Sequence, residues 1–159
     1  FFKERPSPDN PKEMLPVEVE DAVLLLLRLK NGGIAFAEMS RVATGAEDEM
    51  RFEIHGQNGA LAFNLMKPNE LLAFTTREPK DRQGFKVITT LQKYPPPAVM
   101  PAPKFTMGWI RSHVAAQYNF LDCIVNDRMP SPSFHEAFQL HLLLEAAYRS
   151  VEQNKWVKV

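Results

Sequence analysis

The stretch between residues 17 and 91 consists of short runs of apolar and polar residues separated by turn sequences, with no helical repeat between them. The first run, "VEVEDAVLLLLRLK", ends at "NGG" (residues 31–33), where Asn-Gly supplies the positive φ values of a two-residue hairpin turn. "IAFAEMSRVA" returns as its partner, and "EMRFEIHG", "ALAFNL", "LLAFTT" and "FKVITTL" follow. Six successive strands without a helix between them predict an antiparallel sheet and exclude a doubly wound one.

The first predicted strand is apolar on both of its faces. Val23, Leu25, Leu27 and Leu29 share one face, and Ala22, Leu24 and Leu26 share the other. A strand of this kind is covered on both sides in a folded protein. In the third run the alternation turns Met50, Phe52 and Ile54 inward.

The period becomes helical after an irregular proline-rich arm at residues 94–104. The apolar stripe of the first helix, predicted over residues 108–127, comprises Ile110, Val114, Phe120, Leu121 and Ile124. Ser133 with Glu136 forms a capping-box pattern that begins the second helix. The residues of that helix predicted to face the sheet are Phe134, Phe138, Leu142, Leu144 and Tyr148, and "KWVKV" ends the chain as a short strand or extended tail.

These elements predict an α+β fold: an open, mainly antiparallel sheet of about six strands with two long C-terminal helices packed on one face. Residues 1–16 form an extended N-terminal segment, and residues 17–159 form the domain. Two helices of about 20 residues cover only one side of such a sheet. The other apolar face therefore requires a partner, and we expect a homo-oligomer, a dimer or tetramer, through the open sheet face.

Composition excludes several classes of protein. Lys and Arg number 19, and so do Asp and Glu, which argues against nucleic acid or an anionic membrane surface as the main partner. No apolar run approaches the length of a membrane span. The single cysteine, Cys123, lies in an apolar helical pattern, which predicts a buried side chain and a reducing, cytoplasmic location. A chain that begins at "FFKERPSPDNP" looks like part of a longer one.

Three segments in this order carry a family resemblance: "VEDAVLLLLRLKNGGIAFAEMSRVATG", "EIHGQNGALAFNLMKPNEL" and "PSFHEAFQLHLLLEAAYRSVEQNKWVKV". Together they resemble the C-terminal domain of the Gfo/Idh/MocA oxidoreductases, over roughly residues 17–159. The resemblance implies a two-domain parent whose missing N-terminal Rossmann domain holds NAD or NADP. It also implies that the sheet domain helps to form the pocket for a sugar- or inositol-like polyol and the subunit interface.

The pair Lys67-Pro68 raises the question of a catalytic lysine. In the family this lysine lies in a Glu-Lys-Pro motif of the Rossmann half, whereas Lys67 follows Met66 in the turn after the fourth strand. We therefore interpret Lys67 as a solvated turn residue. The chain also contains no G-x-G-x-x-G that opens a βαβ unit, so no cofactor is expected in this chain and no residue is assigned a catalytic role.

Three residues are candidates for substrate binding. Trp109 and His113 lie at the start of the first long helix, a stretch that reaches the substrate pocket in the family, and an imidazole can both donate and accept a hydrogen bond. Arg41 ends the second strand, and its guanidinium can hold a carboxylate or phosphate bidentately. The alternatives are a solvated helix histidine and a structural arginine paired with Glu38, Asp48 or Glu53.

The remaining histidines favour structural roles: His55 as a turn residue, His141 on the buried stripe of the last helix and His135 exposed in its first turn. No metal-binding or G-x-S-x-G motif is present.

Two hypotheses for the function of the chain follow. The chain is the substrate-binding and dimerising part of an NAD(P)-dependent oxidoreductase, catalytically incomplete alone, or it is a stand-alone, non-enzymatic dimerisation or ligand-binding module.

Overall fold

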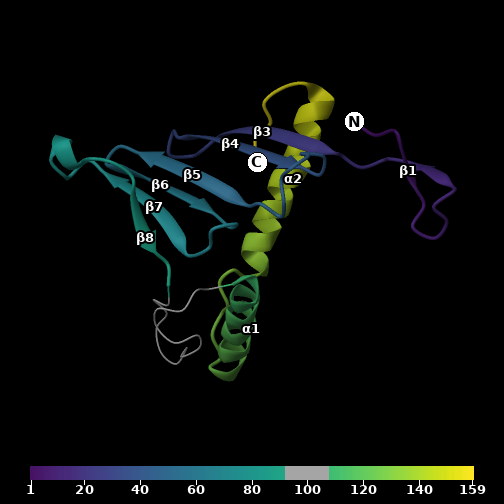
Figure 1. Cartoon of the computed structure of the whole chain (residues 1–159). Coiled ribbons are helices and arrows are strands. Elements are labelled where there is room, and N and C mark those ends of the chain that lie inside the picture. The colour runs from purple at the N-terminus through teal and green to yellow at the C-terminus, as the bar shows by residue number, and fades with distance from the viewer. Residues whose placement is uncertain (92–107) are drawn as a thin grey trace. The chain divides into compact units, whose positions relative to one another are not determined.

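The computed structural model describes residues 1–91 and 108–159, so the arm predicted over residues 94–104 lies outside them. The chain divides into two compact units, Phe1–Ala46 with Phe138–Val159, and Glu47–Ala137, and each is described by itself. Figure 1 labels the elements along the chain: β1 (Glu4–Pro6), β2 (Met14–Pro16), β3 (Ala22–Arg28), β4 (Ile34–Ser40), β5 (Arg51–Gly56), β6 (Gly59–Asn64), β7 (Glu70–Thr75), the 3₁₀ turn η1 (Lys80–Arg82), β8 (Lys86–Thr89), α1 (Trp109–Val125) and α2 (Phe134–Gln153). The predicted α+β class with antiparallel strands and two helices is confirmed.

The first 16 residues are not a simple extended segment, as the sequence had suggested, but a small hairpin. β1 pairs with β2 antiparallel, with Arg5 opposite Leu15. The turn between them closes where the Ser7 N–H donates to the Glu13 carbonyl at 2.8 Å and the Glu13 N–H donates to the Asn10 carbonyl at 2.9 Å. Prolines are tolerated here because the strands are short and both are edges.

β3 and β4 form the hairpin that the sequence predicts, with Leu25 opposite Ala37 in the register. Its turn differs from the predicted two-residue form. The Leu29 N–H donates to the Gly33 carbonyl at 2.8 Å, and only Gly32 takes a positive φ, of 86°. The connection is thus a longer loop closed by a left-handed glycine, a common hairpin form in which Asn31 needs no strained backbone.

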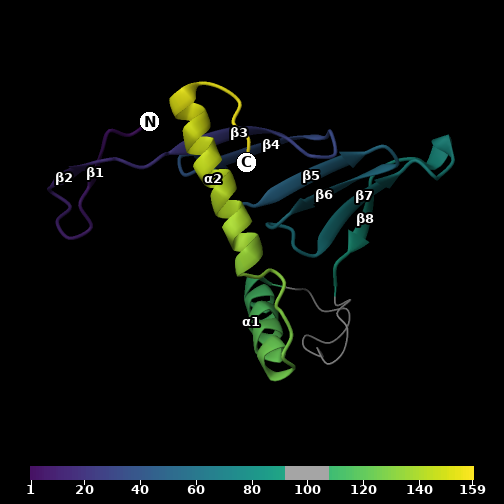
Figure 2. The same ribbon diagram turned by 180° about the vertical axis from the view of Figure 1, so that it is seen from behind.

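The C-terminal part of α2 lies against this hairpin, as Figures 1 and 2 show from opposite sides. The predicted contact face of α2 is wrong: Phe138, Leu142, Leu144 and Tyr148 are exposed, Phe134 is 96% exposed, and His141 is exposed with them. The less exposed stripe is instead Leu143, Ala146, Ala147 and Ser150, which lines one cavity together with Leu25 and Leu27 of β3. The less exposed side of α2 is therefore formed mainly by small side chains and not by the predicted large ones.

The C-terminal tail is extended and forms no strand. The Arg28 guanidinium lies over the Trp156 ring, 4.6 Å from its centroid, and so ties the tail to β3. A hydrogen bond to the Glu20 carboxylate, which also repels the ionised phenolate, raises the pKa of Tyr148 and links α2 to the segment before β3.

The second unit contains a four-stranded antiparallel sheet in the order β5-β6-β7-β8. Its register places Phe52 opposite Phe63, Phe63 opposite Leu71, and Leu71 opposite Ile88, which makes one apolar face. The Phe52 and Phe63 rings lie 5.6 Å apart. Met50, Phe52 and Ile54, predicted to turn inward, are 56%, 42% and 58% exposed, and every residue of β5 is exposed, so the predicted burial of this strand face is wrong for the chain alone.

In the described residues, the helices α1 and α2 begin and end near the residues predicted for them. Cys123 of α1 is 5% exposed, which confirms its predicted burial. At the start of α2, the Ser133 N–H donates to Glu136 Oε2 at 2.8 Å, and the His135 N–H donates to Ser133 Oγ at 3.1 Å. This is the predicted capping box. Its hydrogen bonds from the Ser133 hydroxyl and backbone lower the pKa of Glu136.

The most unusual property of the fold is the amount of apolar surface on its strands. In the described part of the chain, the buried hydrophobic residues are Cys123 and Ala146. On the β3–β4 hairpin, Leu25 and Leu27 are half-buried, whereas the side chains of the opposite parity are exposed: Leu24 is 67%, Leu26 55%, Ile34 74% and Phe36 65% exposed. We call these four residues the open hairpin face. Patches of this kind mark association surfaces.

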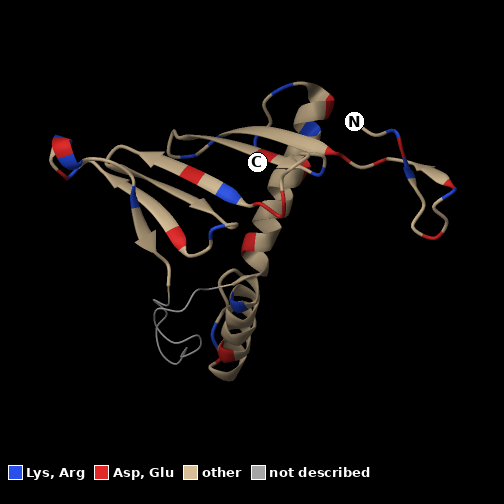
Figure 3. Cartoon of the chain, viewed as in Figure 1, with Lys and Arg blue, Asp and Glu red and all other residues tan. Residues whose placement is uncertain are grey.

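Charges of both signs are scattered along the described residues, and Figure 3 shows no block of Lys and Arg. Neither α1 nor α2 has the length and apolarity that a membrane span requires.

Candidate functional site

Trp109 and His113 lie four residues apart in the first turns of α1, so they share one side of the helix. Their ring centroids are 4.7 Å apart and the ring planes are inclined by 57°. Trp109 is 47% exposed and His113 is also exposed. The pair presents an indole surface on which an apolar or sugar ring can lie, beside an imidazole that can donate or accept a hydrogen bond.

Arg41, the third predicted residue, directly follows β4. Its backbone N–H donates to the Asp21 carbonyl at 2.8 Å, which fixes the chain where the hairpin ends. Of the predicted acidic partners, Glu53 instead lies 3.5 Å from His55, and none of the ion pairs found in the described residues includes Arg41. The prediction of a structural ion pair is therefore wrong, and the guanidinium lines a cavity.

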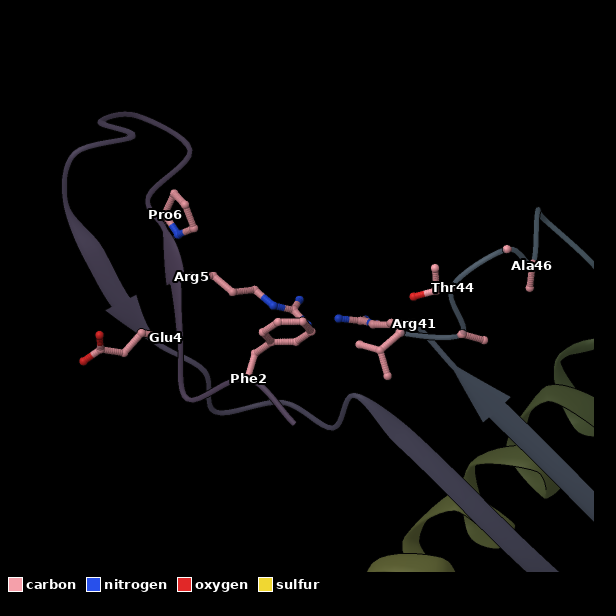
Figure 4. A pocket seen from close by; sticks show the side chains of 10 residues that line it. Phe2, Glu4, Arg5, Pro6, Arg41, Thr44 and Ala46 are labelled. Carbon is pink, nitrogen blue, oxygen red and sulfur yellow. The ribbon is translucent and has the colours of Figure 1, made fainter.

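The cavity beside Arg41 has a volume of about 560 Å³ and lies between β1 and the segment that follows β4. Phe2, Arg5 and Thr44 also line it. Figure 4 shows the Arg5 and Arg41 side chains extending toward one another next to the Phe2 ring. Arg41 thus meets residues of its own compact unit, whereas Trp109 and His113 belong to the other unit.

Asp21 holds this region together and was not identified from the sequence. Its residue is 6% exposed. The carboxylate accepts the Phe2 N–H at 2.8 Å and pairs with the Arg5 guanidinium. The Phe2 hydrogen bond first, and the charge of Arg5 after it, lower the pKa of Asp21 below 3.8. A lone aspartate before an apolar strand carries no signal that would reveal this role, because its partners lie 16 and 19 residues away.

The ion pair between Asp21 and Arg5 predicts that the β1–β2 hairpin is sensitive to acid. Because the pKa of Asp21 is lower in the folded chain than its ordinary value of 3.8, the carboxylate stabilises the fold above that value. The stabilisation is lost as the pH falls through the folded-state pKa. Asp21→Asn should lower the hydrogen-exchange protection of the Val17 and Arg41 amides at neutral pH and remove their loss of protection in acid. Asp9→Asn, in the same hairpin, is the control; equal behaviour of the two variants would refute the role of Asp21.

The other sequence candidates have simple positions. Lys67 is exposed in the turn between β6 and β7, where its N–H donates to the Asn64 carbonyl at 2.9 Å, as a solvated turn lysine requires. His55 lies within β5 and not in the turn after it, and His135 is exposed as predicted. Across residues 1–91 and 108–159, no group of three or more His, Cys, Asp and Glu residues is arranged to hold a metal ion.

Comparison with known proteins gives a consistent result. A family model described as the C-terminal α/β domain of the oxidoreductase family, Gfo/Idh/MocA, matches residues 2–159. The levoglucosan dehydrogenase of Pseudarthrobacter phenanthrenivorans is 30% identical over 145 residues, which are 91% of this chain and 37% of that protein. The chain thus spans less than half of the length of this relative.

Solved structures agree. The chain superimposes on an oxidoreductase domain protein from Kribbella flavida with a TM-score of 0.90 and 29% identity, covering 99% of this chain and 41% of that one. Levoglucosan dehydrogenase in complex with NADH and L-sorbose gives the same TM-score, identity and coverage. An NAD-binding oxidoreductase from Klebsiella pneumoniae gives a TM-score of 0.88 at 26% identity, over 98% of this chain and 42% of that one.

Proposed function

The chain belongs to the Gfo/Idh/MocA oxidoreductase family as its C-terminal α/β domain, and from this premise we propose that it is the substrate-binding and oligomerisation part of an NAD(P)-dependent oxidoreductase that acts on a sugar- or inositol-like polyol. The observation that carries the proposal is the family match over residues 2–159. The solved complex of a relative with NADH and L-sorbose supports the substrate class.

Trp109 and His113 are the residues that we propose for binding the polyol. An exposed indole provides a flat apolar surface for the C–H groups of a sugar, and the imidazole 4.7 Å away offers a hydrogen bond to a hydroxyl. Arg41, which belongs to the other compact unit, is proposed separately as a contact for an anionic ligand group. None of these residues is assigned a catalytic role.

We place the NAD or NADP site in a Rossmann domain of a longer parent protein. Dinucleotide binding of that type requires a glycine-rich turn between a strand and a helix of a parallel βαβ unit. In residues 1–91 and 108–159 every strand pair is antiparallel, so these residues do not fit the pyrophosphate. When bound to the parent, the nicotinamide would supply the hydride chemistry, and this chain would help to position the substrate.

The open hairpin face supports the proposal of a homo-oligomer, a dimer or tetramer. α2 covers the side of the hairpin that carries Leu25 and Leu27, whereas the four residues of the open hairpin face are more than half exposed. A second copy would remove them from water, at about 25 cal/mol of favourable free energy for each Å² of apolar surface. The buried thiol of Cys123 suits the reducing cytoplasm, where we place the protein.

A substitution at His113 tests the substrate site in the full-length parent. His113→Ala should raise KM for the polyol about tenfold and change kcat less, because a contact made equally in the bound substrate and the transition state affects mainly KM. NADH formation at 340 nm against a panel of sugars and inositols gives both constants. His135→Ala, which also removes an exposed histidine from the first turn of a helix, is the matched control. An unchanged KM for His113→Ala would contradict the assignment.

The alternative is a stand-alone, non-enzymatic dimerisation or ligand-binding module. The gene distinguishes the two, since a parent oxidoreductase encodes about 120–200 further residues upstream with a glycine-rich first βα turn. Calorimetric titration of the 159-residue chain with NAD should give no measurable binding. Micromolar affinity for NAD would overturn the proposal that the dinucleotide binds to a Rossmann domain of the parent and not to this chain.

A further inference from the structure

We propose that the cavity between Arg5 and Arg41 binds the oxyanion, carboxylate or phosphate, of a small ligand whose body rests on the Phe2 ring. The proposal deepens the role given to Arg41 and rests on that part of the proposed function. Its test measures binding to the chain alone and needs no hydride transfer, so failure of anion binding and failure of the oxidoreductase assignment are separate results.

The two arginines reach the cavity from segments far apart in sequence. Arg5 lies in β1, and Arg41 follows β4. In Figure 4 their guanidinium groups converge from opposite sides, whereas the Glu4 carboxylate points away from them. Two like charges that face one another repel, and an anion between them converts that repulsion into two attractive contacts. The two parallel N–H groups of a guanidinium also match a pair of oxygen atoms on a carboxylate or a phosphate.

Asp21 leaves this charge available. It pairs with Arg5 on one guanidinium nitrogen, and its side chain is only 3% exposed, so it is not accessible to a ligand or to Arg41. Arg41 forms none of the ion pairs found in the described residues. The cavity therefore retains the uncompensated positive charge of Arg41. It also retains the N–H groups of Arg5 that do not bind Asp21. That combination selects a small anion over a neutral sugar.

Phe2 and Thr44 supply the rest of a ligand site. The Arg5 guanidinium carbon lies 5.7 Å from the centroid of the Phe2 ring, which holds the two side chains as a stack with an apolar surface. Thr44 lies in a turn that closes where the Ala46 N–H donates to the Ala43 carbonyl at 3.1 Å and where Gly45 takes a φ of 90°. In Figure 4 the Thr44 hydroxyl faces the space between the arginines.

The size of the cavity sets the class of ligand. Its volume of about 560 Å³ lies within the range of roughly 300–1,000 Å³ that small-molecule sites occupy. A sugar acid or a sugar phosphate can be accommodated in it with the anion between the guanidinium groups and the ring on Phe2. Inorganic phosphate would occupy only the charged part.

The experiment is an NMR titration of the isotope-labelled 159-residue chain in low-chloride buffer. Inorganic phosphate, D-glucuronate and neutral D-glucose are the three probes. Phosphate and glucuronate should shift the Thr44 and Gly45 amides and the Arg41 side-chain N–H at millimolar concentrations, whereas glucose should not. Tighter binding of glucuronate identifies a ligand with a sugar body, and tighter binding of phosphate identifies a free or terminal phosphate; either result supports the proposal.

Variants separate this site from general charge attraction. Arg41→Ala should weaken anion binding at least tenfold, and Arg41→Lys, which keeps the charge but loses the fork, should weaken it less. Arg149→Ala removes the same charge from an exposed position on α2 and should leave binding unchanged. The proposal is overturned if neither anion shifts these signals, if glucose binds as well as glucuronate, or if Arg41→Ala and Arg149→Ala behave alike.

Discussion

Gly59→Ala is expected to destabilise the β5–β8 sheet by about 2–4 kcal/mol. A Cβ built on Gly59 would lie 2.4 Å from the Phe74 carbonyl oxygen, which belongs to the neighbouring strand of the ladder. Because the obstacle is backbone and not the end of a flexible side chain, relief requires β6 and β7 to separate. Urea denaturation followed by circular dichroism should show a lower midpoint for this variant.

Gly56→Ala is the matched control. Gly56 occupies the other end of the same two-residue turn, opposite Gly59 in the register. A Cβ at Gly56 would approach the Gly59 carbonyl oxygen no closer than 3.7 Å, an ordinary contact. This variant should therefore stay within about 0.5 kcal/mol of the parent. If Gly56→Ala and Gly59→Ala lower the free energy of unfolding equally, the close approach between β6 and β7 is not the cause of the destabilisation.

Phe36→Lys is expected to weaken self-association by roughly 100-fold or more, because a partner copy would have to bury a charged side chain among apolar ones. Phe36 is 65% exposed on the open hairpin face, so the lysine remains solvated in the separated chain and the fold itself loses little. Sedimentation velocity across micromolar concentrations should show a dimer or larger assembly for the parent and a monomer for the variant.

Gln153→Lys controls for the added charge. It introduces the same positive charge at the exposed end of α2, away from the hairpin face. Its assembly should match that of the parent chain. A monomeric parent at micromolar concentration, or a Phe36→Lys variant that assembles as well as the control, would refute the role of this face.

The strands and helices of this fold follow from local pattern. Alternation of apolar residues gave β3–β8 in the right order, and the Ser133 and Glu136 spacing gave the start of α2. Both signals act over two to four residues, where backbone geometry alone decides which side chains share a face.

Contacts between distant segments could not be predicted in this way. The β1–β2 hairpin was missed because its prolines suggested irregular chain, and the α2 face was misjudged because large apolar residues were assumed to be the buried ones. Ala146 and Ala147 line the cavity beside β3 and are less exposed than their large neighbours, a preference that hydrophobicity does not reveal.

The same difference between local pattern and contacts of distant segments applies to the candidate site residues. Trp109 and His113 were candidates because of their place at the start of the first long helix, and their ring centroids lie 4.7 Å apart. Arg41 was selected as a candidate, but Arg5, Phe2 and Asp21 were not, since their proximity to it depends on a hairpin that the sequence did not indicate.

Asp21 has a consequence for variation among relatives of this chain. Its carboxylate holds Phe2 and Arg5, and its backbone carbonyl holds the N–H of Arg41, so one residue sets the separation of the two guanidinium groups. Positions 5 and 21 are thus expected to co-vary, each acidic residue at 21 accompanied by a basic residue at 5. A homologue that loses one residue of this pair should lose the other as well.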